Sequence, residues 1–136
     1  MGSPEVIVLD THALVWWIND PGQLSKTAQA VIEEARKNKT LYVSCISSWE
    51  IALLVQRNRL QLTLDVRDWL ARCEALPFVT FMPVTTAIAV ESTRLPDFPH
   101  ADPADRIIVA TAQSLGARLV TKDEKIHLYR NLQSVW

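Results

Sequence analysis

The chain has 136 residues, of which 49% are hydrophobic and 21% are charged, and its formal net charge is -1. This length and hydrophobic content predict a single domain, residues 1–136, with a sizeable core. The near-neutral charge lacks the basic signature of most nucleic-acid binders, although metal ions can offset a cluster of acids and make that signature unnecessary.

The cysteines and the N-terminal segment point to a cytoplasmic protein. Cys45 and Cys73 are far apart and form no CxxC pattern, which favours small buried thiols in a reduced compartment over a disulfide or a zinc site. No basic region precedes Val6–Leu9, and Asp10 interrupts this apolar run, so we expect no signal peptide. No stretch approaches the roughly 20 apolar residues that cross a bilayer, so no membrane association is expected.

The first half of the chain alternates apolar runs with helical patterns. The short runs favour buried strands, and turn or capping residues separate them from the helices. The expected elements are a strand at Val6–Leu9, a helix over Ala13–Ile18, a turn at Asn19–Gly22, a helix capped by Ser25 and ending in the basic run 36–39, a strand at Leu41–Val43, a helix from Ser47 to about Val55, and a helix capped by Asp65.

The second half repeats this alternation. Gly116 is expected to close the longest helix, as glycine often does just past a helix C-terminus. The expected elements are a strand at Phe78–Met82, a helix from Thr85 to about Arg94, a Pro-rich connector over 95–100, a helix from Pro103 to about Leu115, a strand at Arg118–Val120, a short helix at Glu124–Leu128, and a strand at Leu132–Val135. This order predicts an α/β fold with a parallel sheet covered by helices on both faces.

Four acids lie where such a fold could gather them. Asp10 and Asp123 follow strand ends, and Glu50 and Asp105 each occupy the third position of an expected helix. In α/β sheets, sites form outside the carboxyl ends of the strands. Clustered carboxylates repel one another unless a proton or cation intervenes, and an oxygen-rich, thiol-poor set suits Mg²⁺ or Mn²⁺. A bound metal can activate water and stabilise charge on a phosphodiester, so we predict a metal-dependent active site.

Each acid also has a capping explanation. Glu50 with Ser47 matches a capping box, and Asp102 before Pro103 matches a helix cap followed by an acid at the third position, Asp105. The two acids at strand ends could each cap the following helix. The shared sheet edge favours a site over four separate caps. Asp102 itself is assigned chiefly to capping, with support of a metal ligand or binding of a second metal as the alternative.

Several polar residues border the predicted site, and each has two interpretations. Thr11 and Thr121 could orient a water or phosphate, or make turn and strand-end hydrogen bonds. Arg106 could balance the acids or contact phosphate, or form a surface ion pair.

The histidines and the remaining arginines carry weaker expectations. His12 and His100 are expected to have rim or structural roles, and His127 a peripheral one. Arg57 and Arg59 could guide a polyanion, although a solvated helix end is the commoner explanation.

Four segments resemble the successive motifs of PIN-domain proteins, and more narrowly of the VapC-type toxins of toxin–antitoxin modules. They are Val8–Leu14, Ser47–Ala52, Asp102–Ala112 and Leu119–Asp123, and the resemblance covers nearly the whole chain. It implies a three-layer α/β/α sandwich around a parallel sheet of about five strands and a Mg²⁺- or Mn²⁺-dependent endoribonuclease. It also implies a homodimer and inhibition by a cognate antitoxin. The family's acidic quartet would correspond to Asp10, Glu50, Asp105 and Asp123.

Two other functions remain open from the residues alone. An aspartyl phosphotransfer or phosphatase domain would also place an acid such as Asp10 after its first strand, but the phosphatase motif repeats Asp where this chain has His12. A non-catalytic α/β interaction domain would use the acids as helix caps only.

Overall fold

The computed structural model describes residues 3–136 and contains alternating strands and helices. In chain order, the elements are β1 (Ile7–Leu9), α1 (Thr11–Asn19), a 3-10 turn (Pro21–Gln23), α2 (Lys26–Asn38), β2 (Leu41–Ser44), α3 (Cys45–Gln56), α4 (Val66–Glu74), β3 (Val79–Met82), α5 (Thr86–Ser92), α6 (Pro103–Leu115), β4 (Arg118–Val120), α7 (Glu124–His127) and β5 (Ser134–Val135).

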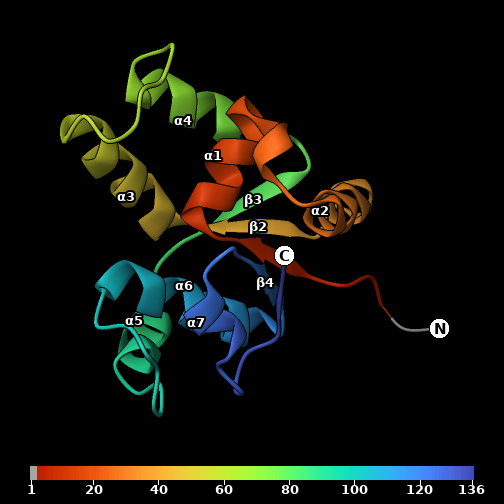
Figure 1. The fold of residues 1–136 in the computed structure, drawn as a ribbon, viewed down its shortest axis with the longest axis vertical. Coiled ribbons are helices and arrows are strands. Elements are labelled where there is room, and N and C mark those ends of the chain that lie inside the picture. Colours follow the sequence, from red (N-terminus) through yellow and green to blue (C-terminus); the bar gives the residue numbers. More distant parts are fainter. Residues whose placement is uncertain (1–2) are drawn as a thin grey trace.

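The strands form one parallel sheet of five strands in the order β3-β2-β1-β4-β5. Figure 1 shows α1 to α4 on one side of this sheet and α5 to α7 on the other. The backbone N–H of Asp10 donates to the Val120 carbonyl at 3.0 Å, so pairing of β1 with β4 continues to the ends of both strands. The predicted three-layer α/β/α sandwich is confirmed.

Alternation along the central strand divides the core into two clusters. Ile7 and Leu9 point into the cluster beneath α1 to α4, whereas Val8 points into the cluster formed with α6, β4 and α7. All three side chains are at most 1% exposed. Because both faces of the strand are covered by helices, its sequence is a continuous apolar run rather than an alternating one.

Helix α3 begins earlier than the sequence pattern indicates. Its N-cap is Ser44, whose hydroxyl accepts from the Ile46 N–H at 3.2 Å. Ser47 lies inside the helix, where its buried hydroxyl is 2.8 Å from that of Thr11. The predicted capping box between Ser47 and Glu50 is therefore wrong, because the strand passes directly into the helix and leaves Glu50 in the second turn.

Other boundaries differ by a residue or two. Helix α1 begins at Thr11, directly after its cap Asp10, because the carboxylate accepts from the first helical N–H. Gly116 closes α6 as expected, with φ of 62° in the left-handed region that glycine adopts readily.

Two further observations concern the expectations about thiols and membranes. Cys45 and Cys73 are both free, and Cys73 is buried as expected, but Cys45 at the start of α3 is only half-buried. No helix within residues 3–136 is long and apolar enough to cross a membrane.

Candidate active site

The candidate site lies where the strand order changes direction. From β1 the chain builds outward to β2 and β3, and later returns to place β4 on the other side of β1. A crevice outside the carboxyl ends of the strands forms at such a switch point. A pocket of about 250 Å³ is found here, lined by Asp10, His12, Ala13, Trp16, Glu50, Asp105, Lys122 and Asp123. The structure therefore brings together all four acids singled out from the sequence.

Asp10 joins the ends of the two central strands. Its Oδ1 accepts from the Thr11 N–H at 2.7 Å, and its Oδ2 accepts from the Thr121 hydroxyl at 2.7 Å. Burial raises the pKa of this carboxyl, the two hydrogen bonds lower it, and the nearby charge of Asp123 adds a further small rise. The hydrogen bonds fix the direction of the carboxylate, since both of its oxygens have a donor.

The two threonines are fully buried and act within the protein. Thr121 donates to Asp10 and accepts from the Asp123 N–H at 3.1 Å, so one hydroxyl positions two acids. Thr11 bonds to Ser47 and joins α1 to α3. Both threonines make the turn and strand-end hydrogen bonds of one interpretation, and a role in orienting water or phosphate stays a prediction.

Asp123 is held by a helix and by a histidine. Its Oδ1 accepts from the N–H groups of Lys125 and Ile126 at 2.9 and 3.2 Å, which caps α7. Its Oδ2 lies 2.9 Å from Nε2 of His100. Sequence reasoning gave His100 only a structural or rim role. The 23-residue separation from Asp123 leaves no local spacing that could have indicated this contact.

His127 is not peripheral. Its ring lies between the Thr121 carbonyl at 2.7 Å and the Ser134 hydroxyl at 2.6 Å. This ring therefore links α7, β5 and the residue that positions Asp10. His127 lies only six residues after Thr121, but no spacing motif indicates that its ring contacts that carbonyl.

Asp105 has the most perturbed carboxyl of the site. Burial, followed by the charges of Asp10, Asp102 and Glu50, raises its pKa from 3.8 to about 7. Its carboxylate accepts no hydrogen bond from residues 3–136, in contrast to that of Asp10. Burial likewise raises the pKa of Glu50, and the charges of Asp10 and Asp102 add to the effect. These groups therefore favour a bound proton or a cation.

Asp102 caps a helix and lies close to two of the other acids. Its Oδ1 caps α6 by accepting from the Ala104 and Asp105 N–H groups at 2.8 and 3.3 Å. It also contributes to a cluster in which ligand atoms of Glu50, Asp102 and Asp105 all lie within 4.8 Å of one another. The expected cap is confirmed, and Asp102 lies beside Glu50 and Asp105.

The arginines lie outside this arrangement. Arg106 donates to the carbonyls of His100 and Ser92 at 2.8 and 3.2 Å, and its guanidinium lies over the Phe98 ring. It forms no ion pair within the part of the chain that the structure describes, so the surface ion pair, one of the two interpretations of Arg106, is wrong. Arg57 and Arg59 are exposed beyond the last turn of α3.

The donor set fits a hard divalent cation. A second group of candidate ligands, His100, Asp105 and Asp123, shares Asp105 with the first and has ligand atoms within the same 4.8 Å limit. Five of the six contributions to the two groups are carboxylates, which Mg²⁺ and Mn²⁺ prefer to nitrogen or sulfur. Burial is the main cause of the raised pKa of Asp105, and a cation here would favour the charged carboxylate against both burial and the neighbouring acids.

Comparison with known proteins agrees with this geometry. The PIN domain family matches residues 7–132. Ribonuclease VapC22 of Mycobacterium tuberculosis (strain ATCC 25618 / H37Rv) is 37% identical over 129 residues, which are 95% of each chain. Among solved structures, VapBC2 from Rickettsia felis, bound to a DNA fragment from their promoter, has a TM-score of 0.71 at 18% identity and covers 96% of this chain and 97% of that chain.

A second solved structure, FitAcB from Neisseria gonorrhoeae, has a TM-score of 0.67 at 20% identity over 96% of this chain and 97% of that chain. At such identities the structural likeness concerns the fold, whereas the sequence match to the family spans both central strands and all four acids. The chain belongs to the PIN domain family.

Proposed function

We propose that this chain is a Mg²⁺- or Mn²⁺-dependent endoribonuclease and the toxin of a toxin–antitoxin pair. The observation that carries the proposal is the pocket in which Asp105, with a pKa raised to about 7, lies among three other carboxylates. The 37% identical relative is named a ribonuclease, and the structural neighbours include toxin–antitoxin complexes. A single PIN-like domain of residues 1–136, a homodimer, a cognate antitoxin and a cytoplasmic location complete the proposal.

Some residues of the pocket would bind the metal, and others would orient the carboxylates that bind it. Asp10, Glu50, Asp105 and Asp123 would hold the cation, with Asp102 close enough to take part. Thr121 fixes the direction of Asp10, and His100 fixes that of Asp123. The bound metal would supply an activated water and stabilise charge on the phosphodiester oxygens. These ligands need little reorganisation, since hydrogen bonds already orient two of them.

The two alternative functions fit the geometry less well. A phosphatase motif of this kind repeats Asp two positions after the first, but this chain has His12 there. A purely structural set of acids would cap helices, but the Asp105 carboxylate caps none. Strongly raised carboxyl pKa values in a pocket are typical of functional sites.

The decisive test is RNA cleavage by protein that has been freed of any inhibitor by unfolding and refolding. With Mg²⁺ or Mn²⁺ we expect defined cuts in a mixture of structured RNAs, and EDTA should stop them. Asp105→Asn should lower the rate about 100-fold or more, because the metal loses a charged ligand.

Asp65→Asn is the matched control, since Asp65 caps α4 away from the pocket and asparagine caps as well as aspartate does. It should cleave like the wild type. Refolded wild-type protein that leaves diverse RNAs intact in both metals would contradict the proposed function.

A further inference from the structure

One part of the pocket lining carries no acid. His12 and Trp16 of α1 border the pocket together with Lys122, which follows β4. The ammonium nitrogen of Lys122 lies 5.8 Å from the centroid of the Trp16 ring. That ring lies 5.7 Å from the His12 ring and 5.7 Å from the Trp136 ring, centroid to centroid. We refer to His12, Trp16, Lys122 and Trp136 as the cation–aromatic wall.

Lys122 does not neutralise the acids beside it. It forms no ion pair within 4.0 Å among residues 3–136, although it is adjacent to Asp123 in sequence and lines the same pocket as the other acids. The Lys122 side chain is exposed, and its cation–π contact with the Trp16 ring positions the ammonium group without neutralising its charge. A cation kept free at the rim of an acidic pocket remains available to an anionic ligand.

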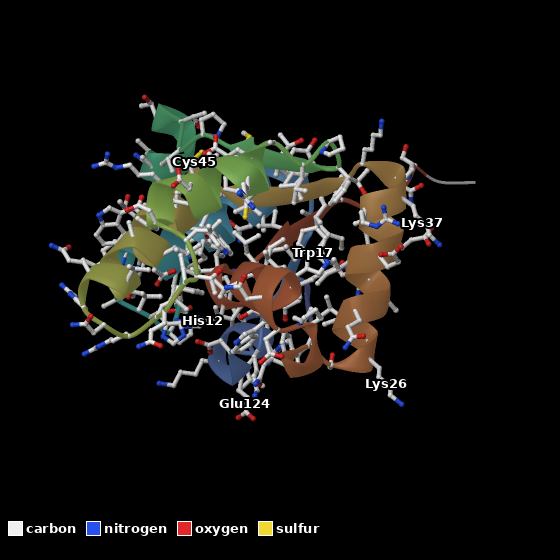
Figure 2. The ribbon with its side chains drawn as sticks, turned by 90° about the horizontal axis from the view of Figure 1, so that it is seen from above. His12, Trp17, Lys26, Lys37, Cys45 and Glu124 are labelled. Carbon is white, nitrogen blue, oxygen red and sulfur yellow. The ribbon has the colours of Figure 1, made fainter. Side chains whose placement is uncertain are left out.

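A second cavity of about 510 Å³ begins at the same lysine. It is lined by Lys122, Glu124, His127, Ser134, Val135 and Trp136. Lys122 borders both cavities, and the contact between Trp16 and Trp136 joins their linings. In Figure 2, His12 from the first cavity and Glu124 from the second lie toward the same edge of the molecule. The two cavities are therefore neighbours that share Lys122 in their linings.

We propose that this wall is a subsite for the RNA strand, in which Lys122 binds the phosphate next to the one that is cut. The proposal rests on the proposed ribonuclease function. The scissile phosphate would lie at the acids, and the strand would continue past Lys122 into the second cavity. Lys122 supplies a point charge for a phosphate, and the rings offer surfaces for base contacts. Lys122 is therefore a positioning residue for the substrate rather than a metal ligand.

Binding to a short labelled single-stranded RNA tests the subsite without cleavage. All variants carry Asp105→Asn, and Lys122→Gln, Lys122→Arg and Lys125→Gln are compared over a series of salt concentrations. Lys125 is the matched control because it is an exposed lysine three positions away that lines a different cavity. We expect Lys122→Gln to weaken binding about tenfold and to reduce the salt slope by about 0.7, the contribution of one single-strand phosphate. Lys122→Arg should retain most of both, and Lys125→Gln should change neither.

Cleavage by the same substitutions in the otherwise wild-type chain separates positioning from chemistry. Lys122→Gln should raise KM about tenfold with kcat little changed, since the lost contact is equally strong in ground and transition states. Equal behaviour of Lys122→Gln and Lys125→Gln in both assays would overturn the subsite while leaving the ribonuclease proposal intact. The subsite would also be overturned if Lys122→Gln lowered kcat alone. It would be overturned too if this substitution weakened the binding of a poly-aspartate peptide, used as an anionic probe, and left RNA binding unchanged. An inactive wild type would instead contradict the proposed function, and the binding assay would still decide on the subsite.

Discussion

A single buried hydroxyl connects two acids of this pocket. Thr121 donates to the carboxylate of Asp10 and accepts from the backbone N–H of Asp123, so it orients the first carboxylate and holds the backbone from which the second extends. The two hydrogen bonds are 2.7 and 3.1 Å long, and Thr121 itself is fully buried. Removing the hydroxyl would leave a carboxylate oxygen and an N–H group without this partner.

Thr121→Val tests this dependence with almost no change in side-chain volume. We expect a loss of about 1–3 kcal/mol in the free energy of unfolding, because buried polar groups lose their partner. Cleavage should fall as well, since Asp10 loses its orientation. Thr111→Val is the control, because Thr111 is equally buried and its hydroxyl bonds only to the Ile107 carbonyl within α6. A variant at Thr121 that loses stability but keeps full activity would contradict the positioning role.

Asp105 links the stability of the protein to pH and metal. Its pKa rises from 3.8 in the unfolded chain to about 7 in the metal-free fold, so the folded state binds the proton more tightly. Protonation of Asp105 therefore stabilises the folded state fully below pH 3.8, and this stabilisation is lost as the pH rises through about 7. The melting temperature of metal-free wild type should therefore fall, relative to that of Asp105→Asn, between about pH 5 and about pH 8.

A divalent cation should reverse this trend, since it binds the deprotonated carboxyl. At ten times its dissociation constant, Mg²⁺ would stabilise the fold by about 1.4 kcal/mol. Thermal unfolding should show a larger Mg²⁺-induced rise near pH 8 than near pH 5. A rise that is equal at both pH values, or undiminished in Asp105→Asn, would count against metal binding at this carboxyl.

At the scale of elements, caps place the acids. Asp10, Asp102 and Asp123 each cap the helix that follows them, which holds each carboxylate at the junction between one element and the next. Helix α6 is fixed at its other end by Gly116, the only glycine of the described residues with positive φ. The position of Asp105 therefore depends on a helix that is defined at both ends.

Gly116→Ala tests the C-terminal end of α6. An added Cβ would meet no atom within 4 Å, so any cost comes from the left-handed backbone alone. We expect a loss of about 1–2 kcal/mol in the free energy of unfolding, measured by denaturant titration. Gly22→Ala is the control, because its added Cβ makes only an ordinary contact of 3.6 Å and its φ lies outside the strained range. Equal effects at both glycines would contradict this account.

At the scale of the whole molecule, the central strand supports both cores. Leu9 packs beneath α1 to α4, and Leu119 of β4 packs against α6 and α7, yet β1 and β4 are paired residue by residue. Loosening either layer should therefore weaken the other through the shared sheet.

We predict one cooperative unfolding transition for residues 1–136. Leu9→Ala and Leu119→Ala should each destabilise it by about 2–5 kcal/mol, because each leaves a cavity in a packed core. Circular dichroism and tryptophan fluorescence should report the same midpoint in each variant. The exposed Leu128→Ala, at 82% exposure, should leave that midpoint nearly unchanged. Two separated transitions would show that the layers unfold independently.

The sequence by itself determined the order of elements, the parallel α/β architecture and which four acids would meet at one edge of the sheet. Short apolar runs such as Val6–Leu9 predict strands buried on both faces, and acids directly after those runs must lie at one sheet edge. The family motifs gave the same four acids. These inferences depend on local residue patterns and on the topology that those patterns imply, and both can be read directly from the sequence.

Only the tertiary structure decided which side chains contact the acids. The start of α3 could not be read from the sequence, because Ser44 and Ser47 are both good caps and only packing against α1 turns Ser47 inward to Thr11. His100 and Lys122 gained their places in the same way, through contacts with Asp123 and Trp16 that cross between elements. Such contacts depend on the packing of distant segments, and no local periodicity or spacing encodes them.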